Sequence, residues 1–120
     1  MTLERDTLFL LAPDFADAKL GAQSFYCVHC AAIEGILHYY PDLARTLAVV
    51  RVAFPRPRPA IVALLGEAQQ SCPVLVVARP HSAGRHLLKQ SEATGAYFVS
   101  GVESIAAYLS AAYGIAEIHP

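Results

Sequence analysis

The sequence predicts an α/β domain with a four-stranded mixed sheet and helices on both faces. Short apolar runs alternate with amphipathic stretches, and proline or glycine marks most of the boundaries between them. The expected order of elements is strand, helix, strand, helix, strand, strand, helix. A right-handed strand-helix-strand unit followed by a hairpin and a covering helix gives a mixed sheet. We place one domain over residues 1–120, with its core at about 7–113.

Four apolar runs predict the strands, at residues 7–12, 47–54, 73–78 and 97–99. The first run is followed by Pro13, and residues 13–24 are expected to form a loop. The second run leads into a proline-rich turn at 55–59. Residues 79–96 are too long for a hairpin turn, so we expect one helical turn near Leu87 and Leu88.

Three helices follow from apolar periodicity. A stripe at Ile33, Ile36, Leu37 and Tyr40 predicts a helix that begins near Cys27 and ends before residue 41, a proline. A short helix is expected from residue 59 to about residue 66, because proline suits the first turn.

The last helix is expected to run from about residue 100 to residue 114. Ser100 and Glu103 have the spacing of a capping box, in which each side chain bonds the backbone amide of the other residue. This pattern accounts for both residues without any ligand.

Composition narrows the classes of function. The chain has 120 residues, of which 55% are hydrophobic and 16% charged, so it is long and apolar enough to form one core. Nine Lys and Arg against ten Asp and Glu give a net charge of −1, which offers no basic surface for nucleic acid or an anionic membrane. We expect a homodimer, because so apolar a small domain favours a covered surface.

The start of the chain carries charges at Glu4, Arg5 and Asp6 where a signal peptide needs an apolar stretch, and no apolar run is long enough to span a membrane. We therefore expect a cytoplasmic protein. In a reducing compartment its three cysteines are more often catalytic or metal-binding than joined in a structural disulfide.

The segment Phe25-Tyr-Cys-Val-His-Cys30 is the strongest chemical signal. A thiolate is the nucleophile in disulfide exchange, and the positive end of a helix favours negative charge on a cysteine placed there. Cys27 is therefore the candidate nucleophile, and Cys30, one turn later, the candidate resolving thiol. His29 would support the Cys27 thiolate or, alternatively, point into solvent.

Cys-x-x-Cys at the start of the first helix, together with Cys72-Pro73 leading into the third strand, resembles the thioredoxin fold. The segment from Ser100 to Leu109 resembles the last helix of the glutathione transferase N-terminal domain. The whole chain is similar to a bacterial family of small thioredoxin-like proteins that supplies a fold and no activity. His before the second cysteine resembles the bacterial disulfide oxidases, whereas thioredoxin itself has Trp before the motif and Gly-Pro inside it.

The thioredoxin resemblance implies a cis bond between Cys72 and Pro73, close to Cys27, with the backbone there pairing with a substrate chain. Most proteins with the thioredoxin fold have Thr, Val or Ile at the position that corresponds to Cys72. The three cysteines therefore also form an alternative metal site, for zinc or, with His29, His81 or glutathione as a fourth ligand, for an iron-sulfur cluster. A second Cys-x-x-Cys, usual in zinc ribbons, is absent from the sequence.

The transferase resemblance implies that Glu103 and Ser104 hold the γ-glutamyl end of glutathione; capping is the competing interpretation for Glu103. Basic residues after the second and third strands are candidates for binding carboxylates, although we expect most of them to be solvated. These residues are Arg56, Arg58, Arg79, His81, Arg85, His86 and Lys89.

The sequence thus predicts a thiol-disulfide oxidoreductase with a thiol or disulfide substrate and glutathione as a candidate partner. The alternatives are a protein that binds a soft metal and a non-catalytic scaffold that binds a partner in the same groove.

Overall fold

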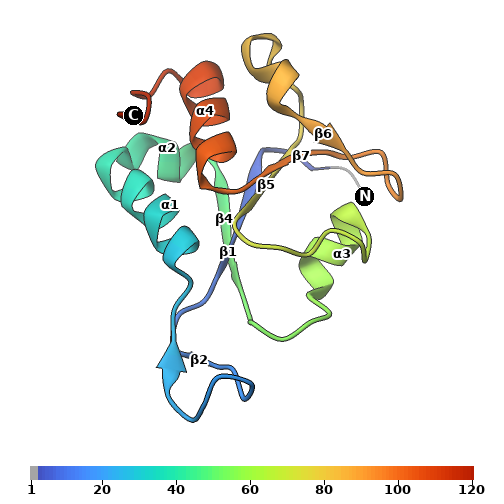
Figure 1. The fold of residues 1–120 in the computed structure, drawn as a ribbon. Helices are drawn as coiled ribbons and strands as arrows, with labels where there is room; N and C mark the ends of the chain where they lie inside the picture. Colours follow the sequence, from blue (N-terminus) through green and yellow to red (C-terminus); the bar gives the residue numbers. More distant parts are fainter. Residues whose placement is uncertain (1–2) are drawn as a thin grey trace.

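A five-stranded mixed sheet forms the centre of the molecule (Figure 1). The computed structural model describes residues 3–120; residues 1 and 2 of the predicted domain lie outside the described part. The sheet has the order β4-β1-β5-β7-β6, in which β4 is parallel to β1 and the other neighbours are antiparallel. The strands are β1 (Thr7–Leu11), β4 (Ala48–Val52), β5 (Val74–Val77), β6 (Lys89–Gln90) and β7 (Tyr97–Ser100).

The α/β class and the mixed sheet are confirmed, but the predicted number of four strands is wrong. The additional strand is β6, which pairs with β7 at one edge. Both residues of β6 are exposed, and two residues cannot show an apolar alternation. Only the long-range pairing therefore reveals it.

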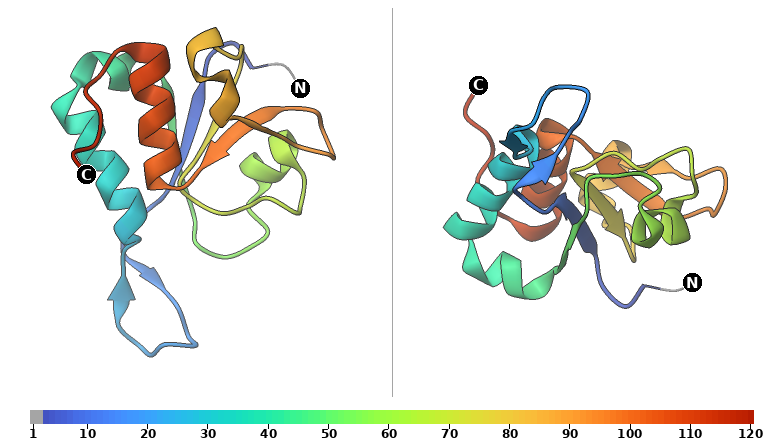
Figure 2. Two further views of the ribbon diagram at one scale, coloured as in Figure 1. Left: turned by 45° about the horizontal axis from the view of Figure 1, so that its top comes forward. Right: turned by 90° about the horizontal axis from the view of Figure 1, so that it is seen from below.

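Helices cover both faces of the sheet (Figures 1 and 2). One face carries α1 (Val28–Tyr39) and α4 (Val102–Tyr113), which also contact each other, while α3 (Pro59–Leu65) covers the other face. Residues 82–87 form a 3₁₀ helix, η1 (Ser82–Leu87), which confirms the expected helical turn. The prediction missed α2 (Pro41–Thr46): Pro41 ends the first helix but also occupies the first turn of the next one.

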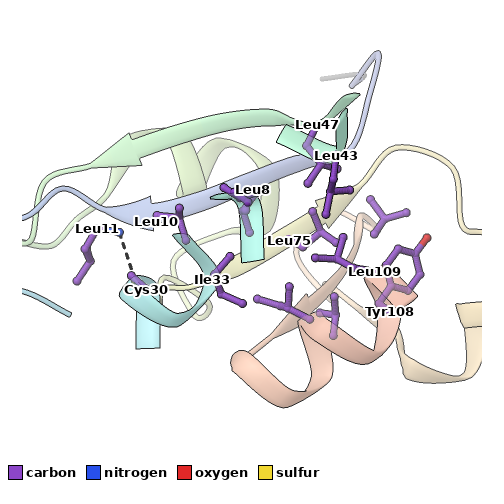
Figure 3. Close-up of a cluster of buried hydrophobic side chains, with 14 residues drawn as sticks. Leu8, Leu10, Leu11, Cys30, Ile33, Leu43, Leu47, Leu75, Tyr108 and Leu109 are labelled. Carbon is purple, nitrogen blue, oxygen red and sulfur yellow. Dashed lines mark hydrogen bonds between the residues drawn. The ribbon is translucent and has the colours of Figure 1, made fainter. Parts of the chain in front are cut away.

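Alternation along the central strands divides the core into two clusters. On β1, Leu8 and Leu10 face α1 and α4, whereas Phe9 faces α3. Figure 3 shows the first cluster, in which Ile33 of α1 and Leu109 of α4 pack under the sheet. The two faces thus fix the start of α1 and the start of α4 relative to β1 and β5.

Residues 13–24, predicted to be a loop, contain most of a small hairpin instead. Its strands are β2 (Phe15–Ala16) and β3 (Ser24–Phe25), and Figure 1 shows it projecting from the body just before α1. Phe15 stacks on Phe54 with ring centroids 4.4 Å apart and an interplanar angle of 5°. This stack ties the hairpin to the loop after β4.

The predicted capping box at the start of α4 is wrong. The N-cap is Gly101, with φ 86°, and no side chain caps the helix. A positive φ suits glycine and moves the helix start one residue beyond Ser100. Glu103 thus lies in the first turn without the capping partner that the sequence suggested.

In the described residues, none of the helices has the length and apolar character needed to cross a membrane.

Candidate functional site

Cys27 is the residue that caps α1. The chain leaves β3 at Phe25, and Cys27 adopts an extended conformation with φ −81° and ψ 114°. Its Sγ accepts a hydrogen bond from the backbone N–H of Cys30 at 3.1 Å. Sulfur thus takes the place of the Ser or Asp oxygen that usually caps a helix, at the end where the helix dipole favours negative charge. Cys27 is half-buried, and its neighbours Tyr26 and Val28 are exposed.

Cys30 lies one turn further along α1 and faces the core. Its side chain is 3% exposed, and its Sγ accepts the backbone N–H of Leu11 at 3.4 Å (Figure 3). Burial, followed by the hydrogen bond with Cys27, raises the pKa of Cys30 to about 12, against a smaller lowering by Leu11. The thiol is therefore protonated at neutral pH.

Cys72 lies on the opposite side of the site. The Cys72-Pro73 peptide bond is cis, as the thioredoxin resemblance implied. Burial raises the pKa of Cys72, and the charge of Arg58 opposes this shift; Cys27 raises the pKa further and Arg56 lowers it. Cys27 and Cys72 pack against the same apolar cluster. The third cysteine therefore lies in the same region of the molecule as the first, close enough for Cys27 to raise its pKa.

Part of the Cys72-Pro73 backbone, which the thioredoxin resemblance predicted to pair with a substrate chain, is already engaged within the protein. The carbonyl oxygen of Pro73 already accepts the N–H of Gly101 at 3.2 Å. This bond joins the strand that follows the proline to the start of α4. It also leaves the peptide groups of Cys72 as the part of the dipeptide that can receive a ligand.

A cavity of about 520 Å³ joins Cys72 to the start of α4. Its volume lies within the range of small-molecule pockets. Because the N-cap of α4 is Gly101 without a side-chain cap, first-turn amides are free to bind an anion there. The cavity is lined by His29, Ser71, Cys72, Pro73, Ser100, Gly101, Val102, Glu103 and Ser104.

Three predicted site residues, His29, Glu103 and Ser104, are exposed and line this cavity. His29 therefore faces the same space as Cys72. The hydrogen bond at the Sγ of Cys27, however, comes from the amide of Cys30 and not from His29. The structure thus places His29, Glu103 and Ser104 around one cavity, and Cys30 is not part of its lining.

Arg58 is the site residue that sequence reasoning misjudged. Most of the other basic candidates are exposed, as expected, but Arg58 is only 6% exposed. Its Nη1 donates to the carbonyl of Gln70 at 2.7 Å, and its Nε and Nη2 donate to the carbonyl of Phe54 at 3.0 and 2.6 Å. The guanidinium carbon also lies 5.7 Å from the centre of the Phe54 ring. No local pattern signals this burial, because Gln70 lies twelve residues away.

The charge of Arg58 has no acidic partner in the structure. The ion pairs formed within residues 3–120 are Arg45 with Asp42 and Arg51 with Glu34. A buried cation bound only to carbonyl oxygens is uncommon, because burying a charge is costly without compensation. Arg58 therefore stands as a fixed positive charge beside Cys72.

The alternative metal site does not appear as a ligand cluster. Among residues 3–120, no group of three or more His, Cys, Asp or Glu side chains is arranged to hold a metal ion.

Comparison with known proteins gives a family and no activity. The model of a family described as a protein of unknown function (DUF3088) matches residues 5–117. The chain therefore belongs to this family. No curated protein and no solved structure matches the chain.

Proposed function

We propose that this member of the DUF3088 family is a thiol-disulfide oxidoreductase with a thioredoxin-like fold. The fold proposal is supported by the strand order β4-β1-β5-β7, in which β5 runs opposite to its two neighbours, and by helices on both faces. The functional proposal is carried by one observation: the Sγ of Cys27 occupies the N-cap of a 12-residue helix and accepts an amide hydrogen bond there.

The proposed reaction begins at Cys27. Its thiolate attacks one sulfur of a disulfide, forms a mixed disulfide with that half, and releases the other half as a thiolate that takes a proton from solvent. A second thiol of the protein then attacks the sulfur of Cys27 and releases the bound half. Cys30 and Cys72 both lie beside Cys27, so two thiols compete for this second step.

The cavity favours a small peptide thiol such as glutathione. The amides at the start of α4 and the hydroxyl of Ser104 suit a carboxylate, and the nearby carboxylate of Glu103 suits an ammonium group. An α-amino acid end group carries both charges. The γ-glutamyl end of glutathione therefore fits this pair of sites, with its thiol directed towards the cysteines.

The experiment is turnover of a disulfide between glutathione and a small thiol, with glutathione as reductant. Cys27→Ser is expected to abolish the protein-dependent rate, because an alcohol does not replace a thiolate in exchange. Ala31→Ser is the matched control, since it adds the same hydroxyl at an exposed position of the same helix. Equal rates for Cys27→Ser and the unaltered protein would refute the proposal and favour a non-catalytic scaffold.

A second variant tests the ligand. Glu103→Gln removes the negative charge at the start of α4 while keeping the size of the side chain. We expect it to raise KM for glutathione with a smaller effect on kcat, because it acts on binding of the ammonium group. An unchanged KM would remove glutathione from the proposal and leave the exchange chemistry at Cys27 in place.

A further inference from the structure

We propose that Cys72, and not Cys30, is the thiol that resolves the mixed disulfide on Cys27, and that Arg58 is the positioning residue that holds the Cys72 thiolate. This inference rests on the proposed exchange reaction at Cys27. The Cys-x-x-Cys spacing alone would make Cys30 the resolving thiol; this inference gives that role to Cys72 instead.

The surroundings of Cys30 oppose a resolving role. Its side chain is buried among the core residues and held by the amide of Leu11, and it does not line the cavity that contains His29 and Cys72. Burial raises the pKa of Cys30 to about 12, so its thiol stays protonated at pH 7. No carboxylate or imidazole contributes to this pKa. A buried thiol without a nearby base loses its proton slowly.

Cys72 is accessible from the cavity and lies near the positive charge of Arg58. It lines the ligand cavity, and its peptide groups are not engaged by the sheet. Arg58 lies close enough to lower the pKa of Cys72, and it is held in place by Gln70, two residues before Cys72, and by Phe54. A guanidinium has five N–H donors, and three of those in Arg58 bind carbonyl oxygens. Two donors and the whole positive charge remain for an anion.

The anion that completes this arrangement is the thiolate of Cys72. Interactions between charges strengthen in a buried environment, so Arg58 acts where solvent screens least. Its charge and its side-chain hydrogen bonding both lower the pKa of Cys72 against the larger effect of burial. Arg56 adds a smaller effect in the same direction. Cys30 has no cation among the groups that shift its pKa.

The reaction balances without any further component. In the mixed disulfide Cys27-S-S-R, the thiol of Cys72 loses its proton to solvent, and its thiolate attacks the sulfur of Cys27. The S–S bond of the mixed disulfide breaks, RS⁻ leaves and is protonated, and a Cys27-Cys72 disulfide forms. Two molecules of a small thiol then reduce this disulfide. The thiolate of the first attacks the sulfur of Cys27 and releases the thiolate of Cys72 beside Arg58. The thiolate of the second attacks the small-thiol sulfur of the new mixed disulfide, so that Cys27 leaves as a thiolate and the two small thiols leave as their disulfide.

The first test compares two variants after reaction with glutathione disulfide. Mass spectrometry of the acid-quenched protein follows the glutathione adduct on Cys27. We expect the adduct to persist at least about tenfold longer in Cys72→Ala than in Cys30→Ala, because only the former lacks the resolving thiol. Peptide mapping of the mildly oxidised, thiol-blocked unaltered protein needs no variant and should show the Cys27-Cys72 disulfide.

The second test addresses Arg58 through a pH profile. In the background Cys27→Ser with Cys30→Ala, the rate of alkylation by iodoacetamide reports the thiolate of Cys72. Arg58→Gln should move this profile to higher pH, Arg56→Gln should move it less, and the distant exposed Arg45→Gln should not move it. Loss of packing alone would make Cys72 more accessible at every pH and would not shift the profile upwards.

The results separate this inference from the proposed function. A Cys27-Cys30 disulfide in the map, or an adduct that persists in Cys30→Ala and not in Cys72→Ala, overturns the role of Cys72 and leaves exchange at Cys27 intact. An unshifted profile in Arg58→Gln overturns the role of Arg58. Absence of an adduct on Cys27 in Cys72→Ala, in Cys30→Ala and in the unaltered protein alike, with no Cys27 disulfide in the map, overturns the proposed function and, with it, this inference.

Discussion

Two sides of the candidate site surround Cys27 in different ways. On the α1 side, Cys30 lies in an apolar core and is held by one backbone amide. On the opposite side, Cys72 lies at the edge of a cavity with the buried guanidinium of Arg58 behind it. Burial raises the pKa of both thiols, but only Cys72 has a cation that opposes this effect. The comparison shows that the cysteine inside the Cys-x-x-Cys motif and the cysteine outside it differ in burial and in the charges near them.

Replacing Arg58, the buried cation near Cys72, should have the largest effect on the free energy of unfolding. Arg58→Met keeps an unbranched apolar side chain at this position, but the carbonyl oxygens of Phe54 and Gln70 lose their charged donors. Hydrogen bonds to charged groups are each worth about 1.5–3 kcal/mol, but Met also removes the cost of burying a charge, so we expect the free energy of unfolding to fall by a net amount of about 3 kcal/mol. Denaturation by urea, followed by circular dichroism, measures this change.

Arg58→Lys tests whether the forked geometry is needed. Lysine keeps the charge but cannot donate along both directions of the guanidinium, so it should recover only part of the lost stability. A loss below about 0.5 kcal/mol in Arg58→Met, the range of ordinary surface substitutions, would contradict the bracing role.

Much of the fold could be predicted because its long elements carry their own patterns. The stripe on α1, the apolar runs of β1 and β5, and proline in the first turn of α3 each record a local physical preference. The prediction failed at β6, whose two residues are too few to show an apolar alternation, and at Pro41, which both ends α1 and begins α2. The residues next to these positions in the sequence do not indicate the correct structure in either place.

Only part of the candidate site could be predicted from the sequence. Cys27, Cys72 and Glu103 could be singled out because residue type and spacing carry chemistry. The burial of Arg58 could not, because it depends on Gln70 and on the Phe54 ring, which only the folded chain brings together. The same holds for the start of α4, where Gly101 displaces the cap that Ser100 suggested.

A pair of cysteine substitutions sharpens the comparison of the two sides. Cys30→Ala leaves a small void and removes the acceptor of the Leu11 amide, whereas Cys72→Ala acts on a half-buried side chain at a cavity edge. We expect losses of about 2 kcal/mol for Cys30→Ala and below about 1 kcal/mol for Cys72→Ala. Equal losses would mean that Cys30 is not the better buried of the two.

Alkaline pH should reduce the difference between the unaltered protein and Cys30→Ala. The pKa of Cys30 is raised from 9.0 to about 12 by folding, so the folded protein keeps this proton where the unfolded chain releases it. Its contribution to stability is complete below about pH 9 and is lost as the pH rises towards 12. Burial also raises the pKa values of Tyr108 and Tyr113, but these residues are common to both proteins. Urea denaturation at several pH values measures the difference.

An arginine outside the site provides the smallest expected effect. Arg51 of β4 makes a bidentate ion pair with Glu34 of α1, at 2.7 and 2.6 Å, between side chains that are 47% and 35% exposed. Water and salt screen such a pair, so Arg51→Met should cost only about 0.5 kcal/mol, and less as salt increases. Arg58→Met should lose far more and respond less to salt, because solvent hardly reaches Arg58. Urea denaturation of both variants at low and high salt measures this contrast. If the two substitutions proved equal in cost and in salt dependence, the buried guanidinium would have no special electrostatic environment, and the reason for pairing it with the thiolate of Cys72 would disappear.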